Sequence, residues 1–133
     1  MDSSLFGSID FLQKGLDASW LRGQVINNNI ANQDTVGYKA SQVEFENVFA
    51  KALAGDDTGM MTTNARHISG RSNVENVTAS VVREPDGAIN YDGNNVDQEH
   101  EMSEMAKNTL EYYTLVSKMN SDFRKLDAAI KVT

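Results

Sequence analysis

Hydrophobic residues recur with the spacing of a heptad repeat at both ends of this chain, but not in its middle. Near the N-terminus the steps alternate between four and three residues, at Leu5, Ile9, Leu12, Leu16, Ser19, Gly23, Ile26 and Ile30. The same spacing recurs toward the C-terminus, at Met102, Met105, Thr109, Tyr112, Val116, Met119, Phe123, Leu126 and Ile130. Such steps place side chains on one face of a helix. They predict helices over roughly residues 4–31 and 97–131.

The second helix has favourable chemistry along its length. Asn95 or Asp97 could cap its start. Lys107 with Glu111, and Lys118 with Asp122, have the i,i+4 spacing of ion pairs on an exposed helix face.

Two helices of this length have a natural partner in each other. Each spans about 45 Å at 1.5 Å per residue. We therefore expect a mainly α fold, in which the helices pair as a coiled-coil-like hairpin through the apolar members of the two stripes. Residues 1–33 and 97–133 would form this helical unit. Residues 34–96 would form a turn and an irregular, partly β segment.

Several apolar residues lie off these stripes and would stay exposed in a bare hairpin. They are Phe11, Leu21, Val25, Leu110 and Leu115. Exposed apolar surface usually marks an interaction site. The alternative is that the central segment folds back over these residues. The low apolar content of that segment favours external partners.

The central segment is rich in Gly, Asn, Asp, Ser and Thr. Residues 85–87, Pro-Asp-Gly, are typical of a turn, and short β-like stretches flank them at residues 79–83 and 88–91. We expect a hairpin there, and a loop over residues 55–63.

Composition excludes several classes of protein. The chain has 133 residues, 19 Asp and Glu against 12 Lys and Arg, and a net charge of −7. An acidic chain lacks the basic surface that nucleic acids or anionic membranes require. It has no cysteine, and no apolar run approaches the ~18 residues that span a bilayer. The first residues lack a basic and apolar signal sequence, so we expect no signal cleavage.

No pattern of catalytic or metal-binding residues stands out. The two histidines, His67 and His100, do not form a His-Glu-x-x-His motif. Asp92, Asn94 and Asp97 do not follow the twelve-residue pattern of a calcium loop. We therefore predict a protein that is not an enzyme, with no cofactor and no metal.

A polar motif follows the first stripe. Residues 27–39 contain asparagine at four of the first six positions and end in Gly-Tyr-Lys. Asn32 and Gly37 tolerate left-handed backbone angles and could reverse the chain there. Asp34 or Thr35 could bond the backbone of the turn, and Tyr38 could anchor the chain beyond it. Because buried amides need partners, we expect the asparagines in a packed subunit interface.

The motif resembles the signature of flagellar rod and hook proteins. In that family a terminal helix ends in Asn-Asn-Ile-Ala-Asn, followed by Thr and then Gly-Tyr-Lys or Gly-Tyr-Arg. The matching residues are Asn28, Asn29, Ile30, Ala31, Asn32, Thr35, Gly37, Tyr38 and Lys39. Residues 16–22 and 92–97 also look like segments of the proximal-rod members. Val36 is a departure, since the family often has proline there.

The resemblance implies a structural subunit of the bacterial flagellar basal-body rod. Similar proteins leave the cell through the flagellar export apparatus without signal cleavage. They assemble helically with other rod subunits and the base of the basal body (the junction of MS-ring and rod) in the periplasmic zone. The shaft that they form transmits torque. A soluble helical adaptor or chaperone of the export system is the alternative.

Overall fold

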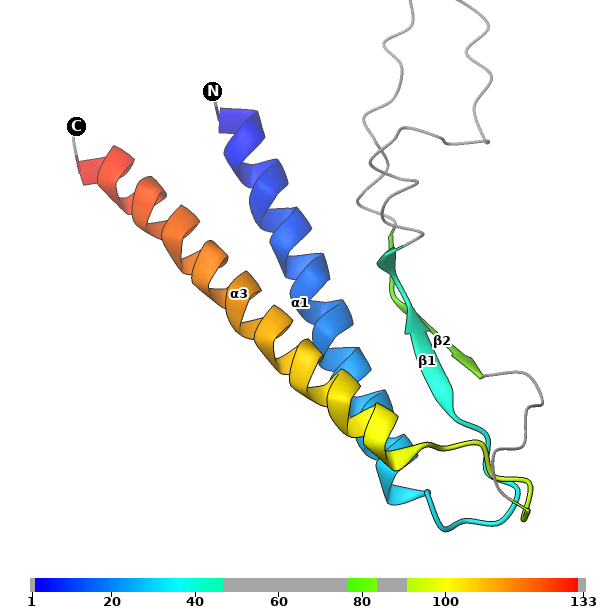
Figure 1. The fold of residues 1–133 in the computed structure, drawn as a ribbon. Coiled ribbons are helices and arrows are strands. Elements are labelled where there is room, and N and C mark those ends of the chain that lie inside the picture. Colours follow the sequence, from blue (N-terminus) through cyan, green and yellow to red (C-terminus); the bar gives the residue numbers. More distant parts are fainter. Residues whose placement is uncertain (1, 47–76, 84–90, 132–133) are drawn as a thin grey trace, which may run out of the picture.

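The structure is a computed structural model that describes residues 2–46, 77–83 and 91–131, with only the backbone of residues 2–8. In order along the chain, the elements are a long helix α1 (Asp2–Ala31), the strands β1 (Ser41–Glu44) and β2 (Ser80–Arg83), and a second long helix α3 (Gln98–Lys131). The helices lie close together where α1 ends and α3 begins, and diverge toward the two termini (Figure 1). The prediction of a mainly helical fold with a small β segment is confirmed.

The stretch predicted as β-like at residues 79–83 forms β2. It is antiparallel to β1, nearly forty residues earlier, and Ser41 lies opposite Arg83 while Glu44 lies opposite Ser80. The predicted hairpin of this stretch with residues 88–91 stays a prediction. The turn at 85–87, most of the second stretch, the loop at 55–63 and His67 lie outside the described residues.

The β segment covers one face of α1. Phe45 and Val77 are buried against Ala18, and Phe11 packs on the same cluster. Val25, another residue off the N-terminal stripe, is also buried. On α1, then, part of the surface for which an external partner was expected is covered by the chain's own central segment. This placement also explains why so short a sheet is stable, since two strands alone are marginal in water.

The contact between the helices is polar where they lie closest. The hydroxyl of Ser19 donates to Asn108 Oδ1 at 2.9 Å, and Asn108 Nδ2 donates back to the Ser19 carbonyl at 3.0 Å. A Cβ added to Gly23 would lie 3.3 Å from that amide nitrogen, and one added to Gly15 would lie 3.4 Å from Leu115. Small residues on every fourth position of α1 thus let α3 approach closely.

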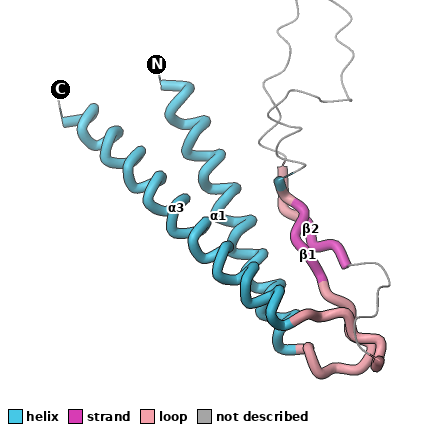
Figure 2. The backbone as a smooth tube through the Cα atoms, in the orientation of Figure 1, coloured by secondary structure: helices cyan, strands magenta, loops and turns pink. Residues whose placement is uncertain are grey.

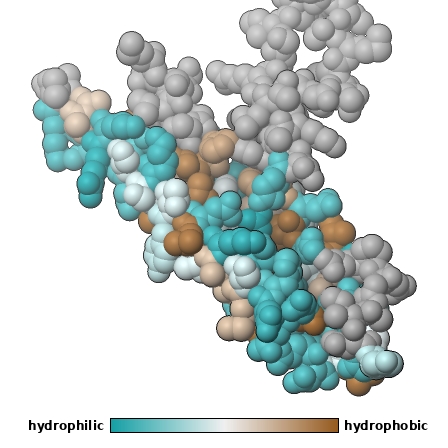
Figure 3. Space-filling model, in the orientation of Figure 1, coloured by the Kyte–Doolittle hydropathy of each residue, from teal (hydrophilic) through white to brown (hydrophobic). Residues whose placement is uncertain are grey.

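The buried positions of α3 are Glu101, Asn108 and Asp122, each one residue before a member of the predicted stripe. Glu101 and Asn108 bond to α1, whereas Asp122 bonds to lysines of α3 itself. Several other stripe residues stay half-buried. Large apolar side chains face outward, among them Leu110 (70% exposed) and Tyr113 (66% exposed). Apolar patches are visible among hydrophilic residues on the surface of the helix pair (Figure 3).

The start of α3 follows from its first residues. Asp97 Oδ1 accepts from the backbone N–H groups of Glu99 and His100 at 3.0 and 3.2 Å. This N-cap satisfies donors that have no partner within the helix. Of the two candidate caps, Asn95 and Asp97, it is therefore Asp97 that caps α3, directly before its first residue, Gln98.

Near the other end of α3, two lysines converge on one buried carboxylate. Lys125 Nζ and Lys118 Nζ donate to Asp122 Oδ1 at 2.8 and 3.2 Å. These hydrogen bonds, that from Lys125 first, hold the pKa of Asp122 below its ordinary value. The predicted pair of Lys118 with Asp122 is present, whereas Lys107 pairs with Glu104 rather than with Glu111.

We predict that Asn108→Ala lowers the free energy of unfolding by about 1–3 kcal/mol, because Ser19 loses its side-chain partner in a buried contact. Thermal unfolding followed by circular dichroism measures the change. Asn120→Ala, on an exposed position of the same helix, is the control and should shift stability by less than about 0.5 kcal/mol. Equal effects of the two substitutions would contradict the proposed importance of the polar contact.

Asp122 makes stability depend on acid. Because its folded pKa is lowered, the carboxylate stabilises the fold fully above its ordinary value of 3.8, and this contribution disappears as pH falls through the folded pKa. Asp122→Asn should therefore lower the melting temperature slightly at pH 7, with a difference from the parent that closes in acid. Both lysines are more than half exposed, so added salt should shrink the effect. A difference that does not change with pH would exclude this mechanism.

Candidate assembly site

The signature motif forms the end of α1 and a compact turn after it. The N–H of Asn32 donates to the carbonyls of Asn28 and Asn29 at 3.2 and 3.0 Å, and the N–H of Thr35 donates to the Asn32 carbonyl at 3.0 Å. Gly37 has a φ of 70°, the left-handed region that glycine tolerates best. Asn32 does not, since no described residue except glycine has a positive φ. The reversal predicted for both residues therefore depends on Gly37.

Asn29 joins the motif to the rest of the fold. Its Nδ2 donates to the Ser41 carbonyl at 2.9 Å and to Glu101 Oε1 at 3.0 Å. Its Oδ1 accepts from the Ser41 N–H at 3.0 Å and from the Tyr38 hydroxyl at 3.4 Å. One amide therefore links α1, β1 and α3. The sequence predicts that the asparagines of this motif lie in a subunit interface. The partners of Asn29 named above instead lie within its own chain.

Asn94 joins the turn to the segment that leads into α3. Its side chain is completely buried. Its Nδ2 lies 2.9 Å from each of three carbonyl oxygens, those of Asn32, Gln33 and Thr35. Its Oδ1 accepts from the Val96 N–H at 2.7 Å. The amide thus satisfies carbonyls at the end of α1 that have no partner within the helix.

Further hydrogen bonds join the loop after α1 (residues 32–40) to the loop before α3 (residues 91–97). Asn95 Oδ1 accepts from the Ala40 N–H at 2.6 Å, and the Gly37 N–H donates to the Asp92 carbonyl at 3.1 Å. Gly93 also has a positive φ, 82°, and a Cβ there would lie 3.8 Å from Gly37. The loops therefore meet at one end of the molecule (Figure 2). We call Asn29, Asn94 and Asn95 the asparagine network.

The remaining signature residues divide between the interior and the surface. Ile30, Asn32, Tyr38 and Lys39 are half-buried, whereas Asn28, Ala31, Thr35 and Gly37 are exposed. Val36, where the family often has proline, is exposed as well. The turn nevertheless forms through its own hydrogen bonds within one chain. The exposed group is available for contacts with other molecules.

The predicted helix-packing residues are likewise divided. Leu12 and Ile26 are buried. Ile9, Leu16, Met105, Val116, Met119 and Leu126 are half-buried. Tyr112, Phe123 and Ile130 are exposed in the single chain. The side chain of Leu5 lies outside the described residues.

The sequence predicts no role for Asn94, and for Asn95 only that of a possible helix cap. In the structure Asp97 is the cap, and Asn95 bonds to Ala40. A usable signal was the succession of Gly93, two asparagines and the helix cap Asp97, which together offer several side-chain groups to a nearby backbone.

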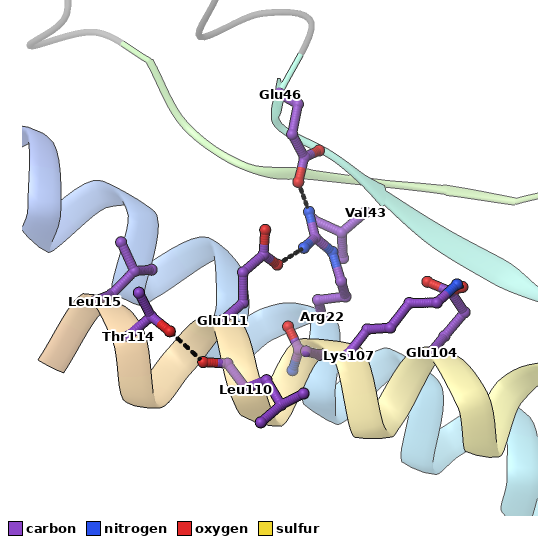
Figure 4. Close-up of a pocket in the computed structure, with 10 residues that line it drawn as sticks. Arg22, Val43, Glu46, Glu104, Lys107, Leu110, Glu111, Thr114 and Leu115 are labelled. Carbon is purple, nitrogen blue, oxygen red and sulfur yellow. Dashed lines mark hydrogen bonds and ion pairs between the residues drawn. The ribbon is translucent and has the colours of Figure 1, made fainter. Parts of the chain in front are cut away.

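A cavity of about 700 Å³ opens between α3 and β1 (Figure 4). Arg22 reaches across it to Glu46 and to Glu111, the latter at 2.9 Å. These charged groups therefore pair with one another, and the walls between them include Val43, Leu110 and Leu115.

Two further properties concern the described residues alone. They contain no group of three or more His, Asp or Glu side chains placed to hold a metal ion. Neither long helix has an apolar stretch sufficient to cross a membrane.

We predict that Asn94→Ala destabilises the fold by about 1–3 kcal/mol, because the turn carbonyls lose a buried amide donor and the Val96 N–H loses its acceptor. Urea unfolding monitored by circular dichroism gives the value. Asn28→Ala makes the same chemical change at an exposed signature position and should cost less than about 0.5 kcal/mol. If Asn94→Ala unfolds at the same urea concentration as the parent, the asparagine network does not hold the loops together.

Comparison with known proteins addresses the family directly. No protein-family model matches the chain. It is 36% identical to flagellar basal body rod protein FlgB of Bacillus subtilis, over 96% of both chains. It is 35% identical to FlgB of Aeromonas hydrophila, over 90% of this chain and 89% of that protein. For FlgB of Borreliella burgdorferi the identity is 30%, over 93% and 96%. With such identity along nearly its whole length, the chain belongs to the FlgB family of flagellar basal body rod proteins.

Proposed function

We propose that this chain is a structural subunit of the flagellar basal-body rod, which packs with other rod subunits into a helical shaft and transmits torque for motility. The observation that carries the proposal is the distribution of apolar residues on α3. Its contact with α1 is polar, through Asn108 and Glu101. Its large apolar side chains, such as Leu110 and Tyr113, face outward.

This distribution favours assembly on energetic grounds. Burying apolar surface contributes about 25 cal/mol per Å², so a single chain forgoes stabilisation that neighbouring subunits could supply. A helix that turns large apolar groups outward presents a surface of the kind that usually marks an interaction site. Adjacent subunits of a shaft would provide that cover, with residues 1–33 and 97–133 as the rod core.

The asparagine network supports a mechanical role. It fixes the end of α1, the start of β1 and the start of α3 to one another through buried hydrogen bonds. Such fully paired buried networks are rigid. A rigid joint at one end of each subunit is what a shaft under torsion requires.

The export-adaptor alternative has less support. An adaptor that stays discrete would not be expected to expose so many large apolar side chains on a long helix. A catalytic role has little support too, since the charged residues at the largest described cavity pair with one another. We propose that the protein is not an enzyme, and that it leaves the cell through the flagellar export apparatus without signal cleavage. Its place in the rod would be next to the base of the basal body.

We predict that Tyr113→Asp abolishes swimming while the purified chain keeps its helicity and melting temperature. Tyr113 is exposed in the single chain, so the charge should cost little until a neighbour buries it. The test is a swimming assay in a bacterium that lacks its own copy of this protein. Ser117→Asp adds the same charge at an exposed polar position of the same helix and should swim like the parent.

A chain that lacks residues 97–133 is the positive control, because it should be unable to build a rod. Basal bodies isolated from cells with that truncation should lack complete rods when viewed by electron microscopy. Normal swimming with Tyr113→Asp, or complete rods without α3, would contradict the proposed function.

A further inference from the structure

One end of the molecule combines exposed apolar side chains with negative charge. The hydrogen bond from the Gly37 N–H to the Asp92 carbonyl holds the preceding residues of both loops, Val36 and Tyr91, at the same end. Val36 is 76% exposed and Tyr91 is fully exposed. We call residues 32–40 and 91–99 the acidic end. Its charged residues are four carboxylates and one lysine: Asp34, Lys39, Asp92, Asp97 and Glu99.

The last turns of α3 combine apolar side chains with positive charge. Phe123 is 49% exposed and Ile130 is 74% exposed, and their spacing of seven places them on one helix face. We call residues 118–131 the basic end. Its charged residues are four cations and two carboxylates: Lys118, Asp122, Arg124, Lys125, Asp127 and Lys131. Arg124 has no ion-pair partner within the part of the chain that the structure describes.

We propose that the acidic end of one copy of this chain docks on the basic end of a second copy. In this contact Val36 and Tyr91 pack against Phe123 and Ile130, and the carboxylate of Asp34 lies among the cations around Arg124. The proposal rests on the proposed function, and it adds the direction in which two copies join.

The fold excludes the same contact within one chain. The two surfaces lie at opposite ends of α3, whose 34 residues extend about 50 Å at 1.5 Å per residue. Each surface must therefore find its complement on another molecule. Because the two surfaces differ, the contact is heterologous, and its repetition builds an open chain rather than a closed dimer.

Charge favours this pairing over the symmetric ones. Two acidic ends repel each other, as do two basic ends, whereas an acidic and a basic end attract. The apolar side chains at the centre of each surface would then be removed from water. The same arrangement, an apolar centre within a charged rim, is common at protein interfaces.

Disulfide trapping tests the contact, because the chain has no cysteine of its own. Purified Val36→Cys and Ile130→Cys chains, one with a size tag, are mixed at low ionic strength under mild oxidation. We expect the mixed disulfide to exceed both symmetric disulfides. A chain with both substitutions should give a ladder of multimers on a non-reducing gel. Thr114→Cys replaces Ile130→Cys in the control, since Thr114 is an exposed polar residue of the same helix and lies outside the basic end.

A charge exchange tests whether the two rims meet. Asp34→Lys or Arg124→Glu alone should lower the yield of mixed disulfide roughly two- to fivefold, the range of an exposed ion pair. The two changes on opposite partners should restore the yield. A control cross-link as abundant as the mixed one, or a predominance of symmetric disulfides, would overturn the proposal. Swimming of the same variants separates the two claims: rods that form while no mixed disulfide appears would refute the docking and leave the rod function intact.

Discussion

The amide of Asn94 is the contact on which the arrangement of the chain depends. It lies 2.9 Å from three carbonyls at the end of α1, while its own carbonyl accepts from the segment that starts α3. Without it, the turn would lose a buried donor and the Val96 N–H would lose its acceptor, at a total cost of about 1–3 kcal/mol. Through Asn29 the same end of α1 is tied to β1 and to Glu101 of α3.

The polar joint has a consequence for the surface of the molecule. Because Asn108 and Asp122 occupy the inner side of α3, the aromatic and aliphatic residues beside them face outward. Polar contacts therefore join α3 to the rest of the fold, an apolar cluster packs the β segment on α1, and much apolar surface of α3 remains exposed. Exposed apolar side chains on a long helix are what a protein of the rod family is expected to have if its subunits pack against one another.

The sequence predicted the parts of the structure that depend on local periodicity. The two helices, the cap at Asp97 and the turn at Gly37 follow from spacing and from backbone preference. Three features did not follow. The pairing of β1 with β2 joins distant segments, for which no local rule exists. The burial of Asn108 beside the predicted stripe depends on its partner Ser19 on α1, and the role of Asn94 depends on carbonyls about sixty residues away. Long-range polar partners are invisible to a pattern of apolar positions.

Cryo-electron microscopy of basal bodies isolated from the source cell tests the central claim most directly. At side-chain resolution it would show what surrounds the outer face of α3 in the assembled rod. The account predicts that Tyr113, Phe123 and Ile130 are buried against neighbouring subunits, with the asparagine network intact in every copy. Density in which these side chains face solvent, or a rod that does not contain this chain, would contradict it.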